Sequence, residues 1–209
     1  MSTYETDEEK VEAIKKWWKE NGVSVVAGAV IGLGAIFGYR AWVGYTDSVG
    51  QQASAAFEQL LASAGGEDAA SAIKQSKLLA EEFSSTAYAT LAKLVAARVE
   101  LRAGNTAGAR EALEQAIADS PDPAITRVAV LRLARMLIAE GDLAGASALV
   151  AKYDDAPSFA GAFAAVRGDI ATTEGRTAEA RSAYEQAIAA GAPNADRLRL
   201  KLDNLPPAG

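Results

Sequence analysis

The side chains that usually carry catalysis or bind metals are sparse in this sequence. It has no histidine and no cysteine, which removes imidazole and thiolate metal ligands and the common nucleophile systems that depend on them. The acidic pairs Glu81–Glu82 and Asp154–Asp155 remain as candidates for general acid and base catalysis. Neighbouring residues of a helix point about 100° apart, so each pair is expected to form a solvated face. We therefore expect no enzymatic activity, no cofactor and no metal site.

Two short motifs have functional meanings that the surrounding sequence disfavours. The tripeptide Arg167-Gly168-Asp169 mediates adhesion when a loop displays it, but here it falls inside an expected helix, where the small Gly168 suits close packing. Gly32 and Gly34 begin a spacing typical of dinucleotide-binding loops, but Phe37 occupies the third glycine position. Both motifs are expected to be structural.

Composition indicates a helical protein that does not bind nucleic acid. The chain has 209 residues and a formal net charge of −6, whereas a nucleic-acid-binding protein needs a cationic surface. Counting the sequence gives 48 alanines, the residue with the highest helix propensity and small enough for close helix packing. An all-α fold follows.

An uncharged run over residues 21–39, bounded by Glu20 and Arg40, predicts a single transmembrane helix. At about 1.5 Å of rise per residue the run spans about 28 Å, close to the hydrocarbon thickness of a bilayer. Aromatic and basic residues favour the two edges of a span. The expected interface anchors are Trp17, Trp18, Tyr39, Arg40 and Trp42. We assign the membrane anchor to residues 21–43.

Two pairs of glycines with small-xxx-small spacing lie within the span, and such pairs let two membrane helices approach closely. The packing candidates are Gly28 with Gly32 and Gly34 with Gly38.

The basic residues around the span predict its orientation. Four lysines precede it and only Arg40 follows it closely, so the positive-inside bias places the N-terminus in the cytoplasm. Bulky residues at the end of the run argue against a cleaved signal peptide. Residues 1–20 are expected to form a cytoplasmic amphipathic segment, either an interfacial helix or a docking site for a partner.

The rest of the chain contains an internal repeat. Residues 104–118 and 175–189 are identical at 11 of 15 positions at an offset of 71, and a third copy begins at Gly141 between them. Half of that offset is close to the period of tetratricopeptide repeats. In each copy a glycine closes one helix, and small and large apolar residues of the next helix fill the space between hairpins. The expected packing positions are Gly104, Ala109, Leu113, Ala116, Gly141, Ala146, Val150, Gly175, Ala180, Tyr184 and Ala187.

These observations predict a single transmembrane helix followed by a tetratricopeptide-like solenoid of about four helical hairpins and a capping helix. The linker is placed at residues 44–50 and the solenoid, expected to be extracytoplasmic, at residues 51–209. Grooves of stacked hairpins bind polypeptide segments of partner proteins. Acidic residues outnumber basic ones in the repeats, which favours a basic or apolar partner segment.

The chain resembles the ancillary SecYEG translocon subunit family over essentially its full length. The resemblance lies in VEAIKKWWKENG, the Gly-rich span ending in GYRAW, SAAFEQLL, FSSTAYATLAKL, LRLARMLIAEGD, RGDIATTEGRTAEARSAYEQAI and the closing LRLKLDNL. It implies a bacterial inner-membrane protein whose periplasmic domain joins the Sec translocon to chaperones, including a prolyl-isomerase-like chaperone. It also implies a cytoplasmic segment that restrains a response regulator of envelope stress.

The leading hypothesis is therefore an adaptor that holds or hands over emerging secretory polypeptides beside the translocon. Two alternatives stay open at this point. One is a scaffold for envelope assembly or division, and the other is a regulator that acts mainly through its cytoplasmic N-terminus.

Overall fold

The computed structural model describes residues 7–66 and 68–206, and within them every regular element is a helix. The elements in chain order are α1 (Asp7–Ala64), α2 (Ala69–Glu82), α3 (Ala87–Arg102), α4 (Thr106–Asp119), α5 (Pro123–Glu140), α6 (Leu143–Tyr153), the short 3-10 helix η1 (Pro157–Phe159), α7 (Ala160–Thr173), α8 (Thr177–Ala189) and α9 (Ala195–Asp203). The predicted all-α fold is confirmed. The chain divides into two compact units, Met1–Gln51 and Gln52–Gly209.

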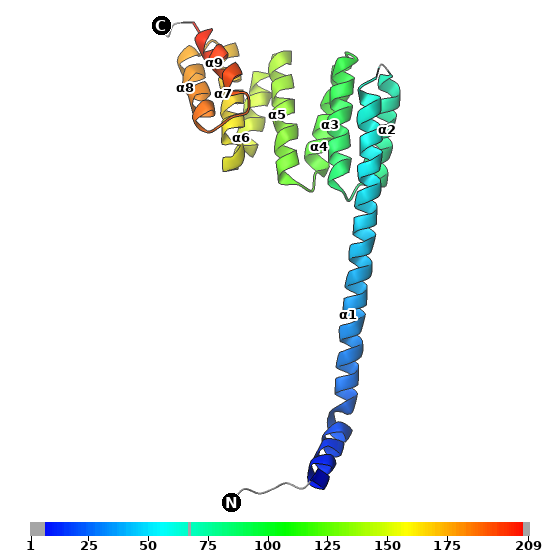
Figure 1. Cartoon of the computed structure of the whole chain (residues 1–209). Helices are drawn as coiled ribbons and strands as arrows, with labels where there is room; N and C mark the ends of the chain where they lie inside the picture. The colour runs from blue at the N-terminus through cyan, green and yellow to red at the C-terminus, as the bar shows by residue number, and fades with distance from the viewer. Residues whose placement is uncertain (1–6, 67, 207–209) are drawn as a thin grey trace, which may run out of the picture. The chain divides into compact units, whose positions relative to one another are not determined.

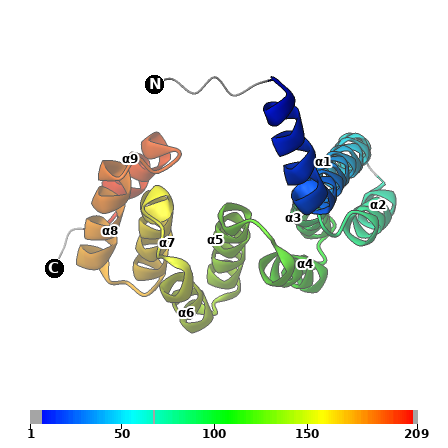
Figure 2. The same ribbon diagram turned by 90° about the horizontal axis from the view of Figure 1, so that it is seen from below.

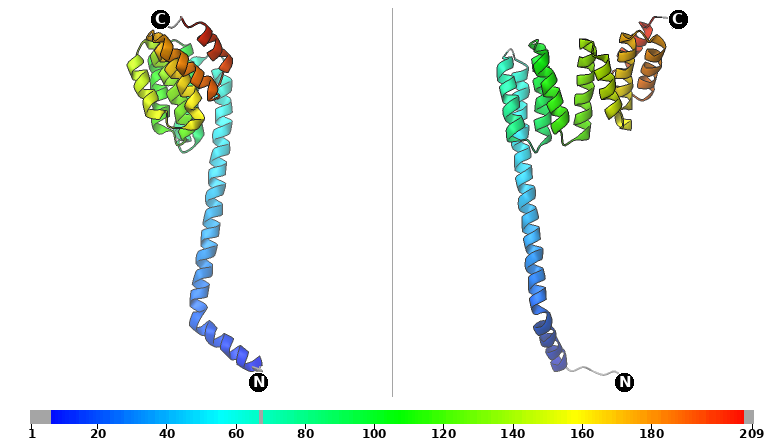
Figure 3. Two further views of the ribbon diagram at one scale, coloured as in Figure 1. Left: turned by 90° about the vertical axis from the view of Figure 1, so that its left-hand side faces the viewer. Right: turned by 180° about the vertical axis from the view of Figure 1, so that it is seen from behind.

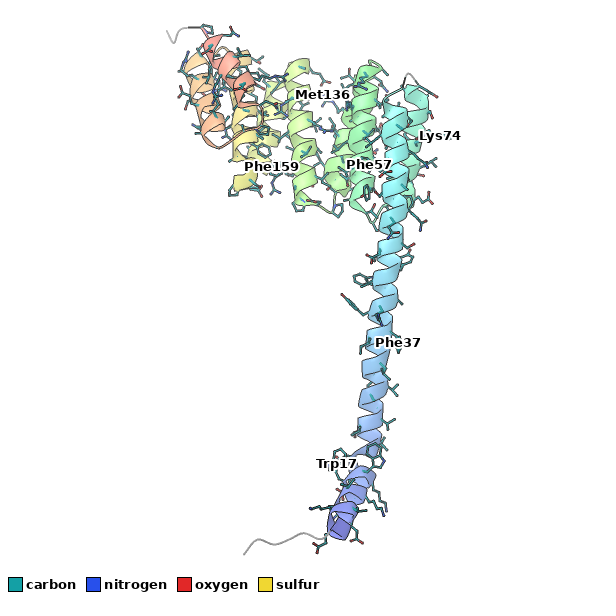
Figure 4. All side chains as sticks on the ribbon, viewed as in Figure 1. Trp17, Phe37, Phe57, Lys74, Met136 and Phe159 are labelled. Atoms are coloured by element: carbon teal, nitrogen blue, oxygen red, sulfur yellow. The ribbon has the colours of Figure 1, made fainter. Side chains whose placement is uncertain are left out.

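The described part of the first unit is the N-terminal portion of α1. Its apolar side chains project outward, as Figure 4 shows for Phe37, and most are exposed. Among the described residues, α1 is the one helix long and apolar enough to cross a membrane. The residues expected to form a linker, 44–50, are helical, and α1 continues through them without a break. No proline interrupts the helix there, and glutamines and alanines of good helix propensity follow Gly50.

The second unit is a stack of antiparallel helix pairs (Figures 1 and 3). The C-terminal part of α1 contacts α2, where the Ser63 hydroxyl donates a hydrogen bond to Gln75 Oε1 at 2.9 Å. It also contacts α3, where the Phe57 and Tyr88 rings lie 5.6 Å apart. The next pairs are α3 with α4, α5 with α6 and α7 with α8, and α9 packs against α8. The predicted arrangement of four hairpins with a capping helix is confirmed.

In each repeat the turn between the two helices contains a glycine in the left-handed conformation. Gly104, Gly141 and Gly175 have φ angles of 79°, 85° and 75°, which L-residues with a Cβ rarely adopt. The next residue caps the following helix in the first two copies. The Asn105 side chain accepts a hydrogen bond from the Gly108 amide at 3.1 Å, and that of Asp142 accepts one from the Gly145 amide at 2.9 Å.

The core of the solenoid is continuous from α3 to α7, and a second cluster joins α7, α8 and α9. Seen from below in Figure 2, α3, α5 and α7 lie along one side of the stack, and α4 and α6 lie along the other. Contacts between α3 and α5 are few compared with those within each hairpin. Helices α3 and α5 therefore meet at few points, and α4, which packs against both of them, joins the two hairpins.

Candidate functional site

The acidic pairs have different surroundings in the structure. Glu81 and Glu82 are exposed near the end of α2, as expected of a solvated face. Asp155 is also exposed, whereas Asp154 is partly buried, and each of the two pairs with an arginine of a different helix. Within residues 7–66 and 68–206, no cluster of three or more acidic side chains is arranged to hold a metal ion.

The two aspartates fix the connection between α6 and α7. Asp154 pairs with Arg167 of α7, and the Oδ1 atom of Asp155 accepts hydrogen bonds from Nη2 and Nε of Arg127 on α5, at 2.6 and 3.1 Å. The hydrogen bond from Arg127 holds the pKa of Asp155 below its ordinary value. The role of this pair is therefore to position a loop.

The tripeptide Arg167-Gly168-Asp169 lies within α7 and is also structural. Gly168 packs against the ring of Tyr184 on α8, and a Cβ at this position would lie 2.5 Å from the ring atom Cδ1. The Tyr184 hydroxyl donates to Asp169 Oδ1 at 2.7 Å, and the same oxygen pairs with Lys201 of α9. Burial raises the pKa of Tyr184. This network joins α7, α8 and the capping helix.

Eight of the eleven repeat positions named from the sequence are buried in the stack, and the turn glycines Gly104, Gly141 and Gly175 are exposed. The buried ones are Ala109, Leu113, Ala116, Ala146, Val150, Ala180, Tyr184 and Ala187. At two equivalent positions, one in each helix of a hairpin, the three copies carry side chains of different size. The pairs are Ala97 with Leu113, Ala134 with Val150, and Gly168 with Tyr184. The smallest residue is thus matched with the largest, which conserves the volume between the two helices of a hairpin.

A groove opens between α3 and α5, with a volume of about 820 Å³. Its floor is apolar and consists of Leu94 and Ala97 of α3, Leu113 of α4 and Met136 of α5, all buried in the solenoid core. Figure 4 labels Met136 on α5. We call this feature the α3–α5 groove. These floor side chains expose at most 7% of their surface, so the apolar surface that a partner could cover lies mainly at the rim, where Leu101 is 46% exposed.

Four exposed arginines line the α3–α5 groove. Arg98 and Arg102 come from α3, and Arg132 and Arg135 come from α5. Burial, followed by repulsion from Arg98 and Arg135, lowers the pKa of Arg132. Arg132 is therefore close enough to Arg98 and Arg135 to be repelled by both, and the groove is locally cationic.

Sequence reasoning did not identify this groove, although a signal was present. Arg98 and Arg135 each stand six residues before the glycine that closes their helix, Gly104 or Gly141, so they occupy the same repeat position. The third copy has Asp169 there. The acidic surplus of the repeats favoured a basic or apolar partner segment, but the local charge of the groove is positive and points to an acidic one.

The aromatic residues named as interface anchors project from the first unit. Trp17, Trp18, Tyr39 and Trp42 each expose more than half of their surface, and the rings of Tyr39 and Trp42 lie 6.3 Å apart. Arg40 is also exposed.

The four glycines of the small-xxx-small pairs open onto free space on α1. A Cβ added at Gly28, Gly32, Gly34 or Gly38 would meet nothing within 4 Å. Interface anchoring by the aromatic residues and helix packing by the glycines stay predictions.

Comparison with known proteins places both units in one family. A family model described as a tetratricopeptide repeat-like domain matches residues 15–207. Three similar proteins carry the name "Ancillary SecYEG translocon subunit". Identity is 29% with the one from Haemophilus influenzae, over 95% of this chain and 97% of the relative. It is 29% with the one from Escherichia coli, over 98% and 99%, and 30% with the one from Aggregatibacter actinomycetemcomitans, over 95% and 97%. No solved structure matches the chain.

Proposed function

This chain belongs to the ancillary SecYEG translocon subunit family, and we propose that it is a membrane-anchored adaptor between the Sec translocon and periplasmic chaperones. The observation that carries the proposal is the extent of the similarity. It covers at least 95% of the chain and 97% of each relative, so the candidate span and the repeats both have counterparts in proteins that bear the name of translocon subunits. The adaptor binds and does not catalyse.

The proposed location is the bacterial inner membrane, with a single pass, the N-terminus in the cytoplasm and the repeats in the periplasm. Support for this orientation comes from Lys10, Lys15, Lys16 and Lys19 before the span, against Arg40 after it. Protease added to spheroplasts should digest the repeats and leave an N-terminal tag protected. Digestion of the tag with protection of the repeats would overturn the orientation and with it the periplasmic role.

The proposed binding site for polypeptide is the α3–α5 groove. Its apolar floor and its walls, which come from two adjacent hairpins, support this choice. The partners proposed for it are a periplasmic prolyl-isomerase-like chaperone and nascent secretory polypeptides. Leu101 at its rim exposes 46% of its surface and offers a position for a crosslinker.

Association with the translocon is tested on the full chain in its native membrane. Purification in mild detergent should recover translocon subunits and periplasmic chaperones. A photoreactive residue in place of Leu101 should crosslink to a chaperone or a secretory polypeptide, whereas one in place of Leu78, equally exposed but on α2, should not. Recovery of unrelated complexes alone would refute the adaptor.

The cytoplasmic segment, residues 1–20, is proposed to contact a response regulator. In its described part, Val11 and Ile14 are exposed apolar side chains on a helix that also carries lysines. Replacing both by serine should release the stress response while chaperone association continues. An unchanged stress response would leave the segment with an interfacial role only.

A further inference from the structure

Most of the other arginines of the repeats form ion pairs, but the arginines of the α3–α5 groove have no acidic partner. Arg110, Arg127, Arg167, Arg176 and Arg199 all form ion pairs. Within the described residues, no carboxylate lies within ion-pair distance of the groove arginines, which are Arg98, Arg102, Arg132 and Arg135. Their hydrogen bonds within the chain are few and long. Arg132 and Arg102 each donate to a backbone carbonyl oxygen, at 3.4 Å.

The acidic side chain that lines the groove does not neutralise them. Glu140 lies at its edge but pairs with Arg110 of α4, across the hairpin junction. The guanidinium groups of the groove repel one another, and within the described residues no ion pair offsets this repulsion. An anionic ligand would remove it.

The positive charge of the groove is opposite in sign to the net charge of the chain. The chain as a whole carries a net charge of −6, so long-range electrostatics repels an acidic partner from most of the surface and attracts it locally to this groove. The arginines come from both walls, with the apolar floor between them. This arrangement, with positive charge on both walls and an apolar floor between them, fits a ligand that presents carboxylates on either side of aliphatic side chains.

We infer that the α3–α5 groove binds an acidic amphipathic segment of a partner polypeptide, in which Asp or Glu side chains alternate with aliphatic ones. The aliphatic side chains lie on the exposed Leu101 and Ala139 above the buried floor, and the carboxylates pair with the arginines of the two walls. Guanidinium groups suit this role because they bind carboxylates through two parallel hydrogen bonds. The inference rests on the proposed role of the groove as a polypeptide site and specifies the chemistry of its ligand.

The test uses the full chain in nanodiscs of phosphatidylcholine and two fluorescein-labelled peptides of leucine and alanine, one with glutamates and one with lysines at the same positions. Fluorescence anisotropy gives Kd for each. The acidic peptide should bind at least about tenfold more tightly than the basic one. Raising the salt concentration from about 50 to about 300 mM should weaken its binding, because screening reduces the attraction between exposed charges.

Removing charge from the groove should remove the preference. The variant Arg132→Gln with Arg135→Gln should raise Kd for the acidic peptide about tenfold and flatten its salt dependence. The matched control, Arg181→Gln with Arg197→Gln, removes the same charge from unpaired arginines outside the groove and should change Kd less than about twofold. Arg98→Gln is a milder change, because Arg98 is exposed and makes no hydrogen bond that the substitution would break. It should raise Kd for the acidic peptide about threefold.

Several results would overturn the inference. They are equal or tighter binding of the basic peptide, an equal loss in the control variant, and displacement of the peptide by vesicles of anionic phosphatidylglycerol. Self-association that blocks the groove would also overturn it. The adaptor function fails separately: if translocon subunits co-purify while the acidic peptide does not bind, only the ligand chemistry is wrong. If the peptide binds and no translocon subunit is recovered, the adaptor is wrong and the groove chemistry stands.

Discussion

The contact between Gly168 and Tyr184 allows a quantitative test of how the repeats conserve volume. Gly168 lies in α7 with its Cα against the Tyr184 ring of α8, whereas the first repeat has Ala97 and Leu113 at the equivalent positions. The perturbation is Gly168→Ala, made in the wild-type chain and again in a chain that carries Tyr184→Leu. The double variant recreates the pair of the first repeat.

The expected magnitude follows from the geometry. An added Cβ would lie 2.5 Å from Cδ1 and 3.0 Å from Cζ of Tyr184, against an optimum of about 3.5–4.0 Å between carbons. Overpacking of this kind costs about 1–3 kcal/mol, and alanine in place of glycine inside a helix returns about 1 kcal/mol. The close contact places the overpacking cost in the upper part of that range, about 2–3 kcal/mol, so we expect Gly168→Ala to lower the free energy of unfolding by about 1–2 kcal/mol.

The same change should have the opposite sign when leucine replaces the ring. Without the clash, only the helix-propensity gain remains, so Gly168→Ala should stabilise the Tyr184→Leu chain by about 0.5–1 kcal/mol. Tyr184→Leu also removes the hydroxyl that donates to Asp169, but this loss is common to both variants and cancels. The resulting coupling free energy is about 1.5–3 kcal/mol, in the upper part of the range for residues in contact.

The assay is urea unfolding of the full chain in mild detergent, followed by circular dichroism at 222 nm. Gly50→Ala is the control, because Gly50 is helical and open space surrounds its added Cβ; without a clash it should not destabilise the chain and should gain at most about 1 kcal/mol. An equal cost of Gly168→Ala in both backgrounds would refute the volume-matching argument. So would a stabilising effect in the wild-type chain.

Three further predictions concern the core, a loop and a turn. Leu113→Ala should lower the free energy of unfolding by about 2–5 kcal/mol, because it leaves a cavity at a residue that is 1% exposed; Leu200→Ala, at a residue that is 62% exposed, should cost less than about 0.5 kcal/mol in the same urea titration. Arg127→Gln should raise the pKa of Asp155 toward its ordinary value of about 3.9, seen in the carboxyl chemical shift, because it removes the hydrogen bond that lowers it. Since that pKa is lowered by folding, the pair stabilises the fold above pH about 3.9 and loses its effect as the pH falls through the folded pKa; an unchanged titration in Arg127→Gln would contradict the assigned cause. Gly141→Ala should cost about 1–2 kcal/mol, because its φ of 85° strains an L-residue; a rise in the melting temperature would contradict this reading of the turn.

Local patterns in the sequence predicted the helices and their order. The glycines at positions 104, 141 and 175 mark the turns because the left-handed conformation is a local property of the backbone. The apolar run before Arg40 predicts a candidate span for a similar reason, since length and hydropathy are properties of one segment. The expected linker is the exception: nothing in residues 44–50 ends a helix, and α1 runs through them.

Contacts between distant residues required the tertiary structure. Asp155 and Arg127 are 28 positions apart, and their pairing depends on how α5 packs beside the loop after α6. Arg98 and Arg135 face one groove only because α3 and α5 lie side by side on the same side of the stack. The sequence by itself determined the repeat, the turns and the apolar run, which depend on neighbouring residues along the chain. The tertiary structure decided which charges are neutralised and which converge unpaired, because Coulomb energy depends on distance in space and not along the chain.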